Sequence, residues 1–123
     1  MLSYPVYKLI HLLGIFMTFV SLGGVLLYVL NNGTKVDNRC RKTVAITHGI
    51  GLFLVLLGGF GMLARLQIHW PWPGWVIVKA IIWVVLGGFN VVVYRLGSRG
   101  QALWYILILL GVLAAYMAVM KPI

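Results

Sequence analysis

Acidic side chains are nearly missing from this sequence of 123 residues. Asp37 is the only aspartate or glutamate, whereas there are ten lysines and arginines. Reactions that use paired carboxylates as general acid and base are therefore excluded. A serine or cysteine hydrolase would lack its acidic orienting residue. A proton-coupled cation exporter needs an acid within the membrane to hold its substrate, and the sequence offers none there.

Cysteine is equally scarce, and charge of either sign is low. Cys40 is the only cysteine, so an intrachain disulfide is excluded. Charged residues make up 9% of the chain and hydrophobic residues 63%, with a mean hydropathy of +1.05. Long apolar runs recur between short polar breaks, which is typical of a membrane protein that crosses the bilayer several times.

The apolar runs predict four transmembrane helices, each near the roughly 20 residues that a bilayer requires. We place them at residues 6–30, 44–64, 75–95 and 102–120. The first run is too long for the apolar part of a cleavable signal peptide, so we expect it to be retained. The predicted fold is all-α: a compact four-transmembrane-helix bundle that forms a single membrane domain over residues 1–123.

The basic residues outside these runs predict the orientation of the chain. The first loop carries Lys35, Arg39, Arg41 and Lys42, and Arg95 and Arg99 flank the third loop. The second loop has only Arg65. By the positive-inside rule, loops one and three are cytoplasmic and both termini lie outside a bacterial-type inner membrane. The net charge of +9 then indicates contact with lipid headgroups, and nucleic acid is not an expected partner.

Four polar residues are predicted within the membrane at positions that call for an explanation. Lys8 and His11 lie near the outer end of the first helix, and Lys79 lies at a similar depth in the third, whereas His48 belongs to the inner leaflet. Helical phase predicts one inward-facing stripe on each helix. The first helix has His11, Gly14, Thr18, Ser21, Gly24 and Tyr28, and the second has His48, Gly51, Gly58, Met62 and Arg65. The third has Trp75, Lys79, Trp83, Gly87, Asn90 and Tyr94, and the fourth has Gly111, Ala115 and Ala118.

Each of these residues has an ordinary explanation as well as a functional one. The lysines can extend to the headgroups, and the histidines can bridge helices by hydrogen bonds. Together, however, Lys8, His11 and Lys79 form a cationic outer pocket without an acidic side chain. Such a pocket suits porphyrin propionates, a lipid phosphate or the chain's own carboxylate at Ile123. A neutral imidazole is also a good ligand for iron.

Several short motifs resemble known families. "YKLIHLLG", "ITHG", "WPGWVIVKAIIW" and "AAYMAVMKPI" are similar, in this order, to the SirB family of small inner-membrane proteins. More distantly, Lys8-x-x-His11 and Trp75-x-x-x-Lys79 resemble HemJ-type protoporphyrinogen oxidases, and the pattern of small helices resembles CopD-like copper proteins. The resemblance to the HemJ type implies haem b, held with a histidine and a lysine that map to His11 and Lys79.

The leading hypothesis from the sequence is a membrane protein that binds haem b or a related porphyrin. His11 would be the axial ligand, Lys79 and Lys8 would hold the propionates, and Gly14 would let the flat ring approach the backbone. His48 is assigned to a second metal site, too far in depth from His11 to share one iron. As an enzyme, the protein would be a porphyrin-linked oxidoreductase.

Two alternatives stay open at this stage. One is a non-catalytic accessory or assembly subunit that packs against a membrane-protein partner or a second copy of itself. The other is copper handling by His11 and His69 with Met117 and Met120, since thioether and imidazole ligands suit Cu(I).

Overall fold

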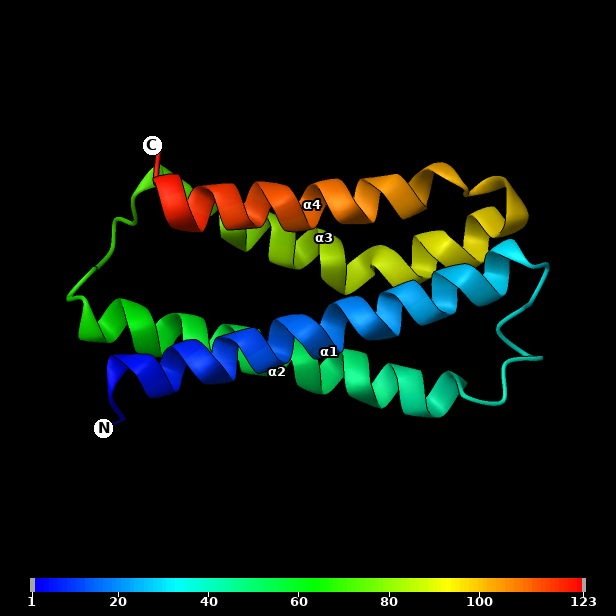
Figure 1. Cartoon of the computed structure of the whole chain (residues 1–123), viewed down its shortest axis with the longest axis horizontal. Helices are drawn as coiled ribbons and strands as arrows, with labels where there is room; N and C mark the ends of the chain where they lie inside the picture. The colour runs from blue at the N-terminus through cyan, green and yellow to red at the C-terminus, as the bar shows by residue number, and fades with distance from the viewer. Residues whose placement is uncertain (1, 123) are drawn as a thin grey trace.

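The computed structural model describes residues 2–122 and contains four long α-helices (Figure 1). They are α1 (Tyr4–Leu30), α2 (Arg41–Arg65), α3 (Gly74–Leu96) and α4 (Ala102–Met120), with a short 3-10 helix, η1 (Gly97–Arg99), between α3 and α4. All four are long and apolar enough to cross a membrane. The predicted all-α, four-helix membrane fold is confirmed. The largest boundary difference is at α2, which begins at Arg41 instead of residue 44.

The local sequence accounts for where α1 ends. Asn32 has a φ of 68°, a left-handed conformation that asparagine tolerates better than most residues. This bend lets the Gly33 N–H donate to the Tyr28 carbonyl at 3.0 Å and the Asn32 N–H donate to the Val29 carbonyl at 2.9 Å. These are the two hydrogen bonds of a Schellman cap, which satisfies carbonyls that the helix itself leaves unpaired.

The helices form two antiparallel pairs, α1 with α2 and α3 with α4 (Figure 1). The start of α1, the end of α4 and the α2–α3 loop lie together at what we call the terminal end. The α1–α2 loop and η1 lie at the opposite end, called the basic end for the cations of loops one and three. This is the arrangement that alternating membrane crossings require, and which end faces the cytoplasm stays a prediction.

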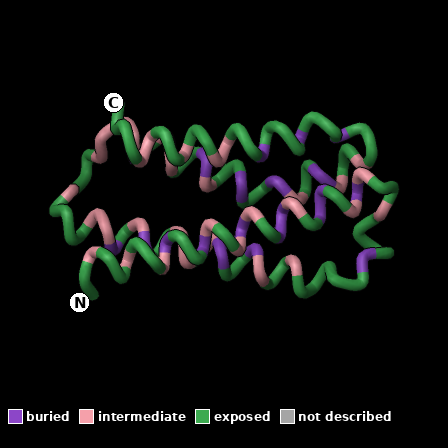
Figure 2. Tube along the Cα trace, in the orientation of Figure 1, coloured by how far each residue is buried: buried purple, intermediate pink, exposed green. Residues whose placement is uncertain are grey.

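The hydrophobic core lies toward the basic end. Buried side chains come from the second half of α1, from α3 and from the start of α4, and they are Leu22, Val25, Leu26, Val29, Ile82, Leu86, Phe89, Val93, Leu103 and Leu107. Figure 2 shows the buried positions gathering in that half of the bundle. Toward the terminal end the two helix pairs separate (Figure 1), and the buried core cluster includes no residue of α1 before Leu22.

Glycines hold α1 directly against α2. A Cβ atom added at Gly14 would lie 2.5 Å from the Gly51 carbonyl oxygen, and one added at Gly58 would lie 2.6 Å from the backbone nitrogen of His11. Thr18 lies in the same contact, where its hydroxyl donates to the Gly14 carbonyl at 2.8 Å. Small residues allow such close backbone approach, which is how helices associate where lipid removes the hydrophobic driving force.

Helical phase identified these packing glycines only in part. His11, Gly14, Thr18 and Ser21 are buried as predicted, as are the α2 residues His48, Gly51 and Gly58. Gly24, Gly87 and Ala115 are exposed, so their predicted inward positions are wrong. The other residues of the predicted α3 stripe are half-buried. The fully buried residues of α3 lie outside this stripe and are apolar. Lipid is as apolar as a protein interior, so a small residue on a transmembrane helix does not by itself mark the packed face.

We predict opposite effects for alanine at two glycines of α1. Gly14→Ala should lower the free energy of unfolding in detergent by about 1–3 kcal/mol, because the new methyl group meets the backbone of α2. Gly24→Ala, where nothing lies within 4 Å, should leave stability unchanged or raise it by about 0.5–1 kcal/mol through helix propensity. Denaturant titration followed by circular dichroism measures both, and equal effects would contradict the proposed contact.

Candidate functional site

His11 lies at the contact between α1 and α2, near the terminal end. Its side chain is 8% exposed, and its Nδ1 lies 2.8 Å from the carbonyl oxygen of Val55. A carbonyl oxygen only accepts, so this hydrogen bond requires Nδ1 to carry the proton. The glycine pair of α2 provides the room: the His11 backbone fits beside Gly58, and its ring lies against Gly59. The packing glycines therefore also fix the orientation of the imidazole.

The second ring nitrogen of His11 is left as an acceptor. Nε2 has no hydrogen-bond partner within residues 2–122. Nε2 is also not fully enclosed by the protein. Among the described residues, Asn90 Oδ1 is the only fully enclosed side-chain nitrogen or oxygen without a hydrogen-bond partner. A neutral imidazole that donates from one nitrogen to a backbone carbonyl and keeps the other lone pair free has the arrangement of a metal-ligating histidine.

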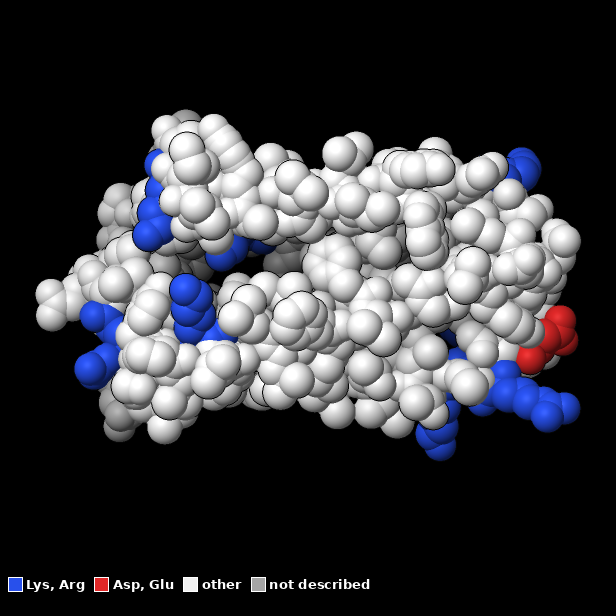
Figure 3. Space-filling model, viewed as in Figure 1, with Lys and Arg blue, Asp and Glu red and all other residues white. Residues whose placement is uncertain are grey.

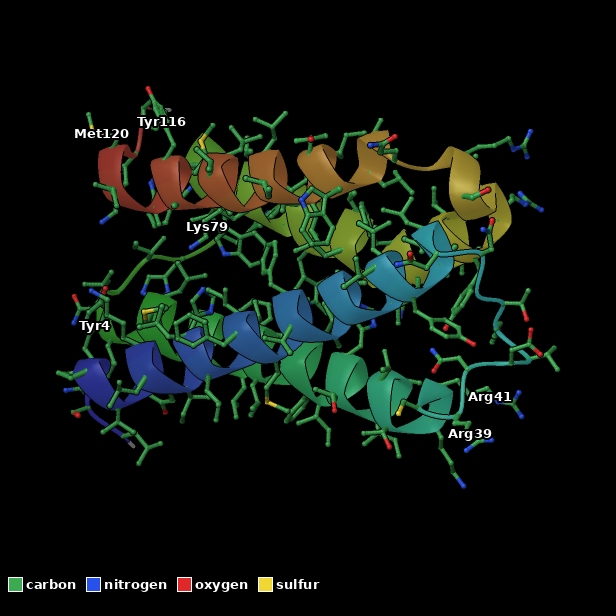
Figure 4. The ribbon with its side chains drawn as sticks, turned by 45° about the vertical axis from the view of Figure 1, so that its right-hand side comes forward. Tyr4, Arg39, Arg41, Lys79, Tyr116 and Met120 are labelled. Carbon is green, nitrogen blue, oxygen red and sulfur yellow. The ribbon has the colours of Figure 1, made fainter. Side chains whose placement is uncertain are left out.

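One lysine of the other helix pair acts on His11, and a second lies beyond it. Lys79 of α3 is half-buried and close enough for its charge to act on the His11 ring, and Lys121 is close enough to act on Lys79. Lys121 Nζ also lies 5.1 Å from the centre of the Trp75 ring, a cation–π distance. Figure 4 shows Lys79 between the two helix pairs, and Figure 3 shows a hollow there with basic atoms at its edge.

No acidic side chain neutralises these cations. The only acid, Asp37, lies in the loop at the basic end, where it accepts a hydrogen bond of 2.8 Å from Thr34 (Figure 3). The carboxylate of Ile123, which the sequence suggested as an internal anion, lies outside the described residues. The candidate site therefore combines a buried imidazole with nearby cations that no acidic side chain balances.

The structure brings together only part of the predicted site. His11 and Lys79 are near one another, whereas Lys8 is exposed on α1. The space beside Gly14 is filled by the backbone of α2, so there is no room at that position for a flat ring. Lys121 is the addition: it contacts Trp75, which the sequence had already placed on the same stripe as Lys79.

His48 has a different surrounding from His11. It is 6% exposed, and its Nε2 lies 3.0 Å from the Leu86 carbonyl of α3. Trp83 of α3 returns the contact, with its Nε1 donating to the Leu52 carbonyl of α2 at 3.0 Å. These two hydrogen bonds join α2 to α3, which supports a helix-bridging role for His48.

The depth separation of the two histidines is smaller than the sequence suggested. His48 precedes Val55, the partner of His11, by seven residues, which is about 10 Å along α2. We had expected most of the membrane thickness between them. His11 contacts α2 through Nδ1, whereas His48 contacts α3 through Nε2, so the two rings are held at different helix contacts.

The residues of the copper alternative differ in exposure, and Met117 is half-buried. His69 is exposed in the α2–α3 loop, and Met120 is 66% exposed at the end of α4. Cys40 is exposed before α2. Within residues 2–122, no three histidine, cysteine or acidic side chains group together as metal ligands. No protein-family model, curated protein or solved structure matches the chain. Function therefore has to be argued from the site.

Replacing His48 should affect stability more than any ligand chemistry. His48→Phe removes the hydrogen bond to Leu86, and we expect it to lower the free energy of unfolding by about 0.6–1.7 kcal/mol, the range for such bonds between membrane helices. Trp83→Phe, which removes the companion bond, should act similarly. Denaturant titration in detergent measures both, and a His48→Phe variant as stable as the wild type would show that the bond carries no packing role.

Proposed function

We propose that this chain is a multi-pass protein of a bacterial-type inner membrane that binds haem b or a related porphyrin at the terminal end, with His11 as axial ligand. The α1–α2 loop and η1 would face the cytoplasm. The observation that carries the proposal is the His11 ring, whose Nδ1 is engaged by the Val55 carbonyl while Nε2 is left free. The distant resemblance to HemJ-type proteins implies the same cofactor.

The donor set fits a porphyrin better than a bare metal ion. A macrocycle brings four nitrogen ligands of its own, so one histidine from the protein is enough. A bare ion would need three or more protein ligands, and no such group of His, Cys or acidic side chains exists in residues 2–122. When bound, haem would supply redox chemistry at its iron.

The cations around His11 suit the propionates. Lys79 lies between the helix pairs and Lys121 is close enough to act on it, and no acidic side chain opposes these two positive charges (Figure 4). Two carboxylates on the ligand would balance that charge in a region where water is scarce. Lys8 is exposed on α1 and would assist only at the membrane surface.

The protein's own residues would have distinct tasks. The Val55 carbonyl holds the His11 ring in one tautomer and one orientation, which raises the basicity of Nε2. Lys79 would set the orientation of the macrocycle, and the Lys121–Trp75 contact would cover the edge nearest the headgroups.

Spectroscopy of the purified protein tests the proposal. Protein purified in mild detergent after growth with haem supplementation should show a Soret band. His11→Ala should lose it, and external imidazole should restore part of it because the ring is the missing group. His69→Ala is the matched control, since His69 is exposed outside the site and its loss should leave the band unchanged. Wild-type protein without a Soret band under these conditions would contradict haem binding.

Metal-free porphyrins separate the propionate contacts from the iron ligand. Wild-type protein should bind protoporphyrin roughly tenfold or more tightly than its dimethyl ester, because charge-assisted hydrogen bonds to the carboxylates are lost in the ester. Lys79→Gln should reduce this preference. Fluorescence titration measures the binding of both porphyrins to the wild-type protein and to Lys79→Gln. If Lys79→Gln leaves the preference for protoporphyrin unchanged, Lys79 is not part of the site.

A specific observation also favours the accessory-subunit function. Gly24, Gly49 and Gly88 face open space with nothing within 4 Å, so they offer flat surfaces for a neighbouring helix. Co-purification of a membrane partner that is lost in Gly24→Leu or Gly88→Leu, while His11→Ala and Lys79→Ala change nothing, would favour this alternative over porphyrin binding.

A further inference from the structure

A pocket with basic residues in its lining lies at the basic end, between α2 and α3. Its cavity is about 470 Å³, within the roughly 300–1,000 Å³ of ligand-binding clefts. Three basic residues line it from the α1–α2 loop and the first turn of α2, namely Lys35, Arg41 and Lys42. The α3 wall contributes Asn90 and Tyr94. This pocket is separate from the His11 site and does not depend on the proposed porphyrin.

The charge in this pocket is unbalanced. The sole acid of the chain, Asp37, is not part of the lining and is paired with Thr34. The N-terminus of α2, which carries the positive end of the helix dipole, has Arg41 and Lys42 in its first turn and no acidic residue there. Cations at this end of a helix repel the dipole, so a bound anion would relieve the repulsion.

Polar atoms in the α3 wall also lack partners. Asn90 Oδ1 is enclosed and accepts no hydrogen bond within residues 2–122, which is unfavourable in a membrane-spanning helix. The Tyr94 hydroxyl accepts from Asn38 Nδ2 at 3.2 Å, so its own hydrogen remains available to a ligand. Asn90 lies one turn deeper than Tyr94, about 6 Å along α3. The pocket therefore offers polar contacts at two depths below a cluster of cations.

We infer that this pocket binds the headgroup of an anionic phospholipid. The phosphate would lie among Lys35, Arg41 and Lys42 and accept from the Tyr94 hydroxyl, while the ester carbonyls of the glycerol region would accept from Asn90 Nδ2. A lipid fits the location, because the pocket opens between two membrane-spanning helices at the level where headgroups lie. Free inorganic phosphate shares the phosphate chemistry but would not extend to the depth of Asn90.

Native mass spectrometry with matched variants tests this inference. The pocket variant is Lys35→Gln with Lys42→Gln, which spares Arg41, since Arg41 holds the loop through the Val36 carbonyl at 3.0 Å. The control is Arg39→Gln with Arg99→Gln, which removes the same charge from exposed residues at the same end but outside the pocket lining. Figure 4 shows Arg39 and Arg41 at this end. Asn90→Leu is a third variant that changes no charge.

Each protein is titrated in detergent with phosphatidylglycerol, with phosphatidylcholine and with inorganic phosphate. Wild-type and control proteins should retain phosphatidylglycerol, and the pocket variant should bind it at least about tenfold more weakly than the control, as expected for lost charge-assisted hydrogen bonds. Asn90→Leu should also weaken the binding of phosphatidylglycerol. Equal losses in pocket variant and control would overturn the inference in favour of general surface attraction. Displacement of the lipid by millimolar phosphate would overturn it in favour of a phosphate site.

Discussion

The hydrogen bond from His11 to the Val55 carbonyl is the interaction on which the candidate site depends. It forms because Gly14, Gly51 and Gly58 let two helix backbones touch, which brings a side chain of α1 within reach of a carbonyl of α2. In the membrane an imidazole needs a protein partner for each nitrogen, and this arrangement satisfies only one. The glycine contact therefore both packs the bundle and leaves a nitrogen lone pair that a ligand can use.

The rest of the structure follows from the uneven distribution of the core. Apolar packing between α1, α3 and α4 closes the bundle toward the basic end, and the helix pairs separate at the terminal end, where Lys79 lies between them. The basic end has a pocket of its own outside this core, where loop cations meet Asn90 and Tyr94. Both ends thus concentrate positive charge without an acidic side chain in the site, as expected from a chain with a single acid. An anionic ligand is therefore what the two proposed sites have in common.

The sequence predicted the fold well because apolar run length is a strong signal in membranes, and it placed all four helices. It also identified His11 and Lys79, since polar residues within apolar runs stand out. It did not separate packing glycines from lipid-facing ones: Gly14 and Gly24 look alike in sequence, yet only Gly14 meets another helix. Nor did it find the Val55 carbonyl, Lys121 or the Asn90 pocket, because contacts between helices depend on how the helices are rotated and tilted, which helical phase does not determine.

The tautomer of His11 tests the central claim most directly. Protein labelled with ¹⁵N-histidine, reconstituted in lipid nanodiscs and compared with a His11→Ala sample for assignment, reports which ring nitrogen carries the proton. The account predicts a neutral ring protonated at Nδ1, with Nε2 unprotonated and shifting when haem is added. A His11 ring protonated at Nε2, or at both nitrogens, would contradict it, because the lone pair assigned to the ligand would then be occupied by hydrogen.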